Sequence, residues 1–159
     1  MEISRRSNHC IIDFIREAFG YNASFISDVS VRNQLVSYVN AGYSSAMYEK
    51  CLKPEVGLSL MVYSDGLSSQ RNSFEETQIV NMVLELWRKG LTSHPDFKKF
   101  FEKGVGIVIP HRAQCTAIRK RLITEFKRIL PTGSYSPAEI KKVINASVDT
   151  VERFQGQQR

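Results

Sequence analysis

Apolar and polar positions follow two different periods along this chain. Apolar residues recur at helical spacing in residues 9–21, and Gly20 follows them as a helix stop signal. The same spacing returns in residues 74–90 and in residues 111–130. Each segment is predicted to be an amphipathic helix that packs one stripe against a core. The predicted stripes are Ile11, Ile12, Phe14, Ile15, Ala18 and Phe19; then Ile79, Val83, Leu86 and Trp87; then Ala113, Ala117, Ile118, Leu122, Phe126 and Ile129.

Three shorter apolar runs are typical of strands. Residues 56–66 end in the turn-forming pair Asp65 and Gly66, and residues 105–110 form a β-branched run of the kind found in buried parallel strands. Residues 146–151 supply the third run. Since strands and helices alternate, the sequence predicts an α/β fold, a three-layer sandwich with a mostly parallel sheet.

Local signals mark where several helices begin and end. Ser73 and Glu76 are spaced as a capping box, and Gly90 is a stop signal. Ser136 is predicted as the N-cap of another helix, with Pro137 at its first position. By contrast, residues 22–54 have weak periodicity and many Ser, Asn, Tyr and Gly residues. They are interpreted as an insertion or as ordinary connecting structure.

The charge balance favours anionic partners. The chain has 159 residues, of which 24% are charged and 42% hydrophobic, as in an ordinary globular domain. Its net charge of +6 suits nucleic acid or nucleotide but does not specify a fold. The predicted helix at residues 111–130 carries basic residues that lie mostly outside its apolar stripe: Arg112, Arg119, Lys120, Arg121, Lys127 and Arg128.

Cysteine usage and hydropathy indicate the compartment. Cys10, Cys51 and Cys115 are widely spaced and include no CxxC pair, which argues against a disulfide framework or a zinc site. No apolar run has the length of a signal peptide or of a membrane span. We therefore expect an intracellular, cytoplasmic protein with no membrane partner, and the nucleus remains open.

Ligands of open parallel sheets bind beyond the carboxyl ends of the strands. This rule points to residues 65–66, 110–114 and 150–157. In the second of these, Arg112 and Gln114 stand at a helix N-terminus, whose N–H groups and partial positive charge suit a phosphate. The amide of Gln114 can bond to a backbone group or to a base. Taken one at a time, the two longer segments are better explained as a solvated helix start and as a surface turn.

Taken together, the segments resemble a known family. "VIPHRAQ" (residues 108–114) and "DTVERFQGQQR" (residues 149–159) are similar to "TPYRAQ" and "DTVDxFQGxExD" of the second RecA-like domain of superfamily 1 helicases. The resemblance is to the branch with the nonsense-mediated-decay helicase and its DNA-replication relatives. The helix at residues 74–90 looks like the family helix before these motifs. "SRRSNHCIIDFI" (residues 4–15) looks like the segment whose arginine reaches the nucleotide, and Arg6 matches that arginine.

The resemblance implies a RecA-like, P-loop NTPase-like fold. In such helicases ATP lies between two RecA-like domains, and single-stranded nucleic acid crosses both. The family's usual Glu is Gln158 here, which can hydrogen-bond a ribose hydroxyl but carries no charge. The residues implied to face nucleic acid are Pro110, His111, Arg112, Gln114 and Thr150, and those implied at the nucleotide cleft are Arg6, Gln155, Gly156 and Gln158.

Parts of the helicase chemistry are missing from the chain. There is no Walker A motif, G-x-x-x-x-G-K-[ST], and no arginine-finger motif. Asp65 is interpreted as a turn residue rather than as the magnesium ligand of a Walker B motif. We therefore expect no catalytic residue, no metal site and no tight ATP binding by this chain alone. ATP and Mg²⁺ would belong to the full-length enzyme.

Two functional hypotheses follow. In the first, residues 1–159 are a partial second RecA-like domain, incomplete at the C-terminus. It contacts single-stranded DNA or RNA and helps the first RecA-like domain of the same protein to close the ATP cleft. In the second, the chain is a catalytically inert nucleic-acid-binding or protein-interaction module that uses the basic helix at residues 112–128. A solvated helix face is the plainer interpretation of that helix.

Overall fold

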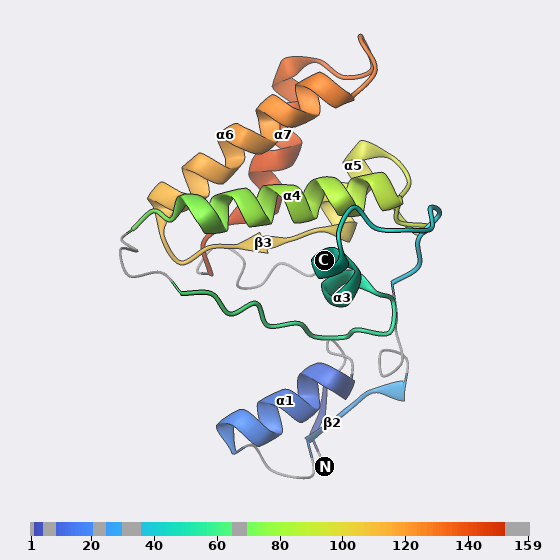
Figure 1. Ribbon diagram of the computed structural model, residues 1–159, viewed down its shortest axis with the longest axis vertical. Helices are drawn as coiled ribbons and strands as arrows, with labels where there is room; N and C mark the ends of the chain where they lie inside the picture. Colours follow the sequence, from blue (N-terminus) through green and yellow to red (C-terminus); the bar gives the residue numbers. More distant parts are fainter. Residues whose placement is uncertain (1, 5–8, 21–24, 30–35, 65–69, 152–159) are drawn as a thin grey trace. The chain divides into compact units, whose positions relative to one another are not determined.

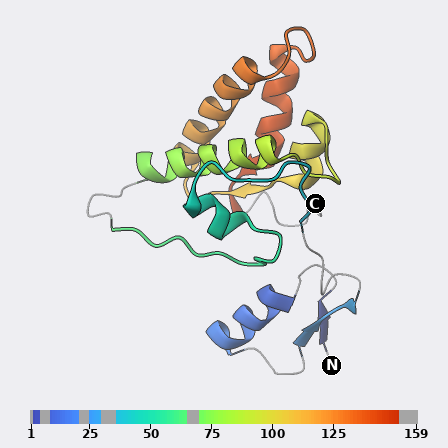
Figure 2. The same ribbon diagram turned by 45° about the vertical axis from the view of Figure 1, so that its right-hand side comes forward.

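The structure is a computed structural model that describes residues 2–4, 9–20, 25–29, 36–64 and 70–151. The chain divides into two compact units, Met1–Tyr63 and Ser64–Arg159, and each is described by itself. Both units combine helices with a short parallel strand pair (Figures 1 and 2). The fold is therefore α/β, mostly helical with little sheet, which is consistent with a RecA-like fold.

The first unit contains a parallel strand pair joined through a helix. β1 (Glu2–Ser4) pairs with β2 (Phe25–Ser27), and α1 (His9–Phe19) lies between them in the chain and contacts β2. The helix is confirmed, and Gly20 ends it with a φ of 66°. Ile12 is the buried residue of α1. Phe14 and Phe19, predicted to face the core, are largely exposed, because so small a unit covers only part of the stripe.

The first unit continues through α3 (Ala46–Leu52), which Ser45 caps at its N-terminus. The carbonyl of Leu52 at the end of α3 accepts hydrogen bonds from the hydroxyls of Tyr38, at 2.8 Å, and Tyr43, at 3.3 Å. Burial raises the pKa of Tyr38 to about 12, and the neighbouring Tyr43 adds to the rise. These contacts fold the region around residues 36–52 onto its own short helix.

The prediction of a strand at residues 56–66 is wrong for residues 56–64, the part of this segment that the structure describes. Residues 56–64 contain a bend and otherwise irregular chain. A strand requires ladder hydrogen bonds from a neighbour, and no described strand pairs with this segment. The side chains of Leu58, Leu60 and Val62 are accordingly exposed, with Leu60 86% accessible to solvent. An apolar run alone could not reveal whether a pairing partner exists.

The second unit places three longer helices around its strand pair (Figure 1). β3 (Ile107–Val108) and β4 (Val148–Asp149) are parallel, with Ile107 opposite Val148 and Val108 opposite Asp149. The N–H of Ile109 extends the pairing by donating to the carbonyl of Asp149 at 3.0 Å. α6 (Arg112–Ile129) and α7 (Pro137–Ser147) form a helical hairpin, and α4 (Ser73–Lys89) packs against α6. The elements in chain order are α4 (Ser73–Lys89), α5 (Phe97–Lys99), the π-helical turn η1 (Phe100–Gly104), β3 (Ile107–Val108), α6 (Arg112–Ile129), α7 (Pro137–Ser147) and β4 (Val148–Asp149).

Aromatic side chains form the core of the second unit. Trp87 of α4 packs edge-on against Phe100 and Phe126, with ring centroids 5.2 Å and 5.6 Å apart. Phe97 and Phe101 complete the cluster, and all four phenylalanines are almost fully buried. Large aromatic rings bury much apolar surface each, so this cluster holds α4, η1 and α6 together.

The helix ends confirm two predictions and correct one. Gly90 ends α4 with a φ of 69°, and Ser136 forms a complete capping box with Glu139. The capping box predicted for Ser73 and Glu76 is wrong. Asn72 is the N-cap of α4, and its side-chain oxygen accepts the N–H groups of the second and third residues after it. The carboxylate of Glu76 binds arginine side chains instead.

One strand boundary and one helix stripe also differ from prediction. The segment at residues 146–151 contributes only Val148–Asp149 to the sheet, because α7 continues through Ser147. On α6, Ala113 and Ile129 are exposed although they were predicted to face the core. The buried side chains of α6 are Gln114, Cys115, Ile118, Leu122 and Phe126, and those of α4 are Glu76, Val80, Val83, Glu85 and Lys89.

The three cysteines, all within the described residues, form no disulfide. Among the described helices, none is both long enough and apolar enough to cross a membrane.

Candidate nucleic-acid interface

A cavity of about 140 Å³ lies where β3 and β4 end and α6 begins. We call it the strand-end cavity. Arg112 and Thr150, which come from two separate predicted segments, both line it. They meet there because parallel strands present their carboxyl ends at the same edge of a sheet. The remaining lining residues are Cys115, Thr116, Arg119 and Asp149.

The loop from β3 into α6 places one cationic side chain at the cavity. Pro110 and His111 are exposed, and His111 is the N-cap residue of α6. Arg112 follows at the first helical position and is also exposed. The first N–H groups of a helix have no intrahelical partner and carry partial positive charge. The guanidinium therefore stands beside a helix end that itself favours an anion.

Thr150 follows β4 and is almost fully buried, with 7% of its surface exposed. Its backbone N–H donates to the carboxylate of Asp149 at 2.8 Å. The same carboxylate pairs with Arg119 at 3.3 Å. The negative charge of Asp149 is therefore compensated within the cavity wall, and Arg112 supplies the cation that faces solvent.

Arg119 has a structural role that the sequence pattern did not reveal. Its Nε donates to the carbonyl of Val148 at 2.8 Å, and its Nη2 donates to the same carbonyl and to that of Asn145 at 3.2 Å. These bonds attach the end of α7 and the start of β4 to α6. Arg119 was expected mostly outside the inner stripe, but its side chain is only 23% exposed. Its position three residues before Leu122 and seven before Phe126, both in the predicted stripe, is the signal that could have shown this.

Gln114 is buried, and its amide binds backbone groups. Its Oε1 accepts the N–H of Asn72 at 2.8 Å, and its Nε2 donates to the carbonyl of Asn72 at 2.9 Å. Of the two partners considered for this amide, a backbone group or a base, the structure shows the backbone. The residue thereby links the start of α6 to the start of α4.

The residues implied at the nucleotide cleft, Arg6, Gln155, Gly156 and Gln158, lie outside the described residues. Asp65 does as well. Their proposed roles therefore remain predictions.

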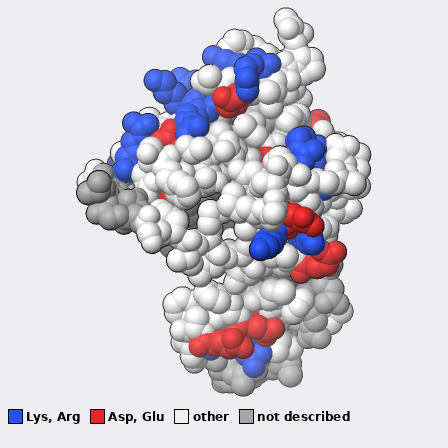
Figure 3. All heavy atoms as spheres, in the orientation of Figure 1, with Lys and Arg blue, Asp and Glu red and all other residues white. Residues whose placement is uncertain are grey.

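Positive charge gathers over α6. Figure 3 shows lysine and arginine side chains clustered on this helix in the second unit. Arg112, Lys120 and Lys127 are exposed along it. Arg128 is exposed too and pairs at 2.7 Å with Glu125, the only carboxylate on α6. This surface suits an anionic polymer.

Comparison with known proteins identifies the family. A family model described as an AAA domain matches residues 1–159, the whole chain. No curated protein and no solved structure shows a significant match. The family match agrees with the parallel strand pairs and with the predicted relation to helicases. The chain belongs to this AAA-domain family and is a helicase-like AAA domain.

Proposed function

We propose that the chain is the second motor domain of a superfamily 1 helicase and contacts single-stranded DNA or RNA at the strand-end cavity. The observation that carries this proposal is the meeting of Arg112 and Thr150 at the carboxyl ends of two adjacent parallel strands. Such strand ends are where open α/β sheets bind ligands. The family match supports the helicase part of the proposal.

The size of the strand-end cavity favours a backbone group over a base. Small-molecule pockets typically measure about 300–1,000 Å³. A cavity of 140 Å³ is smaller than that range and suits one phosphate group. Arg112 can donate two parallel hydrogen bonds to phosphate oxygens, and the N-terminus of α6 adds partial positive charge. Contacts of this kind position a strand without reading its sequence.

In this proposal the chain helps to close the ATP cleft but does not itself hold ATP or catalyse its hydrolysis. The sequence has no phosphate-binding loop, so ATP and Mg²⁺ would be held by the first RecA-like domain of the same protein. Arg6, Gln155, Gly156 and Gln158 are proposed to complete the cleft from this side. Hydrolysis needs the loop and the metal together, and we therefore expect none from this chain alone.

Binding of a fluorescently labelled single-stranded oligonucleotide tests the nucleic-acid contact. Fluorescence anisotropy at low ionic strength should show binding that weakens as salt rises. Arg112→Gln should weaken binding of the oligonucleotide about threefold or more. It should also reduce the slope of log K against log salt concentration by about 0.7, the value for one lost phosphate contact. Lys141→Gln, which removes the same charge from the exposed surface of α7, is the matched control. Failure of the unchanged chain to bind would contradict the proposal.

The alternative function is a catalytically inert nucleic-acid-binding or protein-interaction module. The basic surface of α6 favours it, since that surface needs no ATP to bind an anionic polymer. The two functional hypotheses can be distinguished by measuring ATP hydrolysis in the protein encoded by the full gene. The motor hypothesis predicts ATP hydrolysis that single-stranded nucleic acid stimulates and that Arg6→Ala abolishes. Nucleic-acid binding with no such hydrolysis would favour the inert module.

A further inference from the structure

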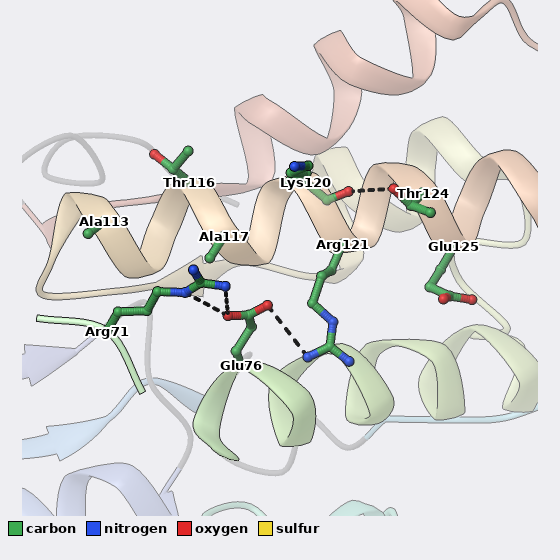
Figure 4. A pocket seen from close by; sticks show the side chains of 9 residues that line it. All are labelled: Arg71, Glu76, Ala113, Thr116, Ala117, Lys120, Arg121, Thr124 and Glu125. Carbon is green, nitrogen blue, oxygen red and sulfur yellow. Dashed lines mark hydrogen bonds and ion pairs between the residues drawn. The ribbon is translucent and has the colours of Figure 1, made fainter. Parts of the chain in front are cut away.

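A second, larger depression lies between α4 and α6, next to the strand-end cavity. It is open to solvent and has a volume of about 420 Å³. We call it the α4–α6 groove. Figure 4 shows the charged side chains that line it, which are Arg71, Glu76, Lys120, Arg121 and Glu125.

Glu76 organises the arginines of the groove. Its carboxylate is only 4% exposed, and its Oε2 accepts from Nε of Arg71 at 3.2 Å and from Nη2 at 3.0 Å. Its Oε1 lies 3.5 Å from Nη1 of Arg121, which also donates to the hydroxyl of Thr77 at 2.8 Å. One buried carboxylate therefore holds two guanidinium groups, one at each of its oxygens (Figure 4).

The groove keeps an excess of positive charge. Arg71, Lys120 and Arg121 face two carboxylates, Glu76 and Glu125. Glu125 is also paired with Arg128 outside the groove. The side chains of Arg71 and Arg121 are 60% and 40% exposed, and a guanidinium has five N–H bonds, more than the two hydrogen bonds of Arg71 to Glu76 use. The solvent side of the groove therefore presents cationic donors.

The groove and the strand-end cavity share a wall. Thr116 lines both of them. Arg112, Thr116 and Lys120 follow one another at four-residue spacing on α6, so each step advances about 6 Å along one face of the helix. Ala113 and Ala117 lie beside this line and leave room above the helix. A chain of anions leaving the strand-end cavity can thus continue into the groove.

We propose that the α4–α6 groove binds a backbone phosphate of the single-stranded nucleic acid, next to the phosphate at the strand-end cavity. This inference rests on the proposed function and extends the interface along α6. Arg71 and Arg121 offer planar forks to the phosphate oxygens, and Lys120 supplies a point charge. Glu76 is a positioning residue that holds the forks in place and lowers the net charge of the empty groove.

The first test removes the groove's lysine. Lys120→Gln should weaken binding of a labelled single-stranded oligonucleotide about threefold and reduce the salt slope by about 0.7. Lys120 is exposed, so its loss should leave folding intact. Lys141→Gln on α7 is again the charge-matched control and should bind as the unchanged chain does.

The second test gives an effect of opposite sign. Glu76→Gln keeps a side-chain oxygen that can accept from Arg71 and Arg121 and hold them in place, but it removes the negative charge that opposes a phosphate. Affinity for the oligonucleotide should therefore rise about twofold or more at low salt. A carboxylate with a merely structural role would instead give unchanged or weaker binding in this variant. Urea denaturation followed by Trp87 fluorescence verifies that both variants fold.

The outcomes separate the two proposals. If the unchanged chain binds the oligonucleotide and Lys120→Gln binds like Lys141→Gln, the groove proposal is overturned while the proposed function stands. If the unchanged chain shows no salt-sensitive binding, the proposed nucleic-acid contact itself fails. A polyglutamate peptide of matched charge that binds as tightly as the oligonucleotide, and loses affinity in Lys120→Gln, would assign the groove to acidic proteins and overturn the nucleic-acid proposal.

Discussion

The side-chain amide of Gln114 binds both backbone groups of Asn72, accepting the N–H at 2.8 Å and donating to the carbonyl at 2.9 Å. The side chain of Asn72 in turn caps α4. One amide therefore joins the N-termini of α4 and α6, two helices that are distant in sequence. The strand-end cavity and the α4–α6 groove both lie beside this junction.

Gln114→Ala should destabilise the protein by about 3 kcal/mol, because two buried backbone groups lose their hydrogen-bond partner. Urea denaturation followed by Trp87 fluorescence measures the change. Gln70→Ala removes the same side chain from an exposed site just before α4 and should change the free energy of unfolding by less than about 0.5 kcal/mol. Equal effects in the two variants would contradict this role for Gln114.

Arg119→Met should destabilise the second unit by about 2 kcal/mol, since the carbonyls of Asn145 and Val148 lose a charged donor. Hydrogen exchange should locate the effect at the amide of Ile109, which bonds to Asp149 across the strand pair. Arg128→Met is the control, because an exposed ion pair on one helix contributes little. Unaltered protection of Ile109 in Arg119→Met would count against the prediction.

Phe126→Ala should lower the free energy of unfolding by about 4 kcal/mol, since it leaves a cavity inside the aromatic core. Trp87 is the single tryptophan of the chain and packs against Phe126, so its emission should shift to the red as water gains access. Ile129→Ala, on the exposed end of the same helix, should cost less than about 1 kcal/mol. A small loss in Phe126→Ala with an unchanged spectrum would show that the core is not packed this way.

Ser136→Ala should raise the pKa of Glu139. Hydrogen bonds from the backbone N–H and the hydroxyl of Ser136 hold the pKa of this carboxyl below its usual range, and the variant removes only the hydroxyl. A carboxyl with a lowered folded-state pKa stabilises the fold above its ordinary pKa, and that contribution is lost as pH falls through the folded-state pKa. The variant should therefore lose less stability between neutral and acid pH. An NMR titration of Glu139 that matches in both proteins would contradict this.

The helices were predictable because their signals are local. Gly90 ends α4 as expected, and Ser136 with Glu139 caps α7 through contacts three residues apart. The apolar spacing predicted both ends of α1, α4 and α6 to within about two residues. The rule for parallel strand ends also indicated that Arg112 and Thr150 would share an edge, and both line the strand-end cavity.

By itself, then, the sequence determined the helices, their stop signals and the two segments that face the strand-end cavity, since near neighbours along the chain encode these. Tertiary structure decided which distant partner each polar group takes. Glu76 pairs with arginines instead of closing a capping box, and Gln114 binds a backbone 42 residues away. The apolar run at residues 56–64 illustrates the same point, because it resembles a strand in sequence but has no pairing partner among the described strands. Hydrogen bonds between distant residues depend on which surfaces meet in space, and spacing along the chain carries no record of that.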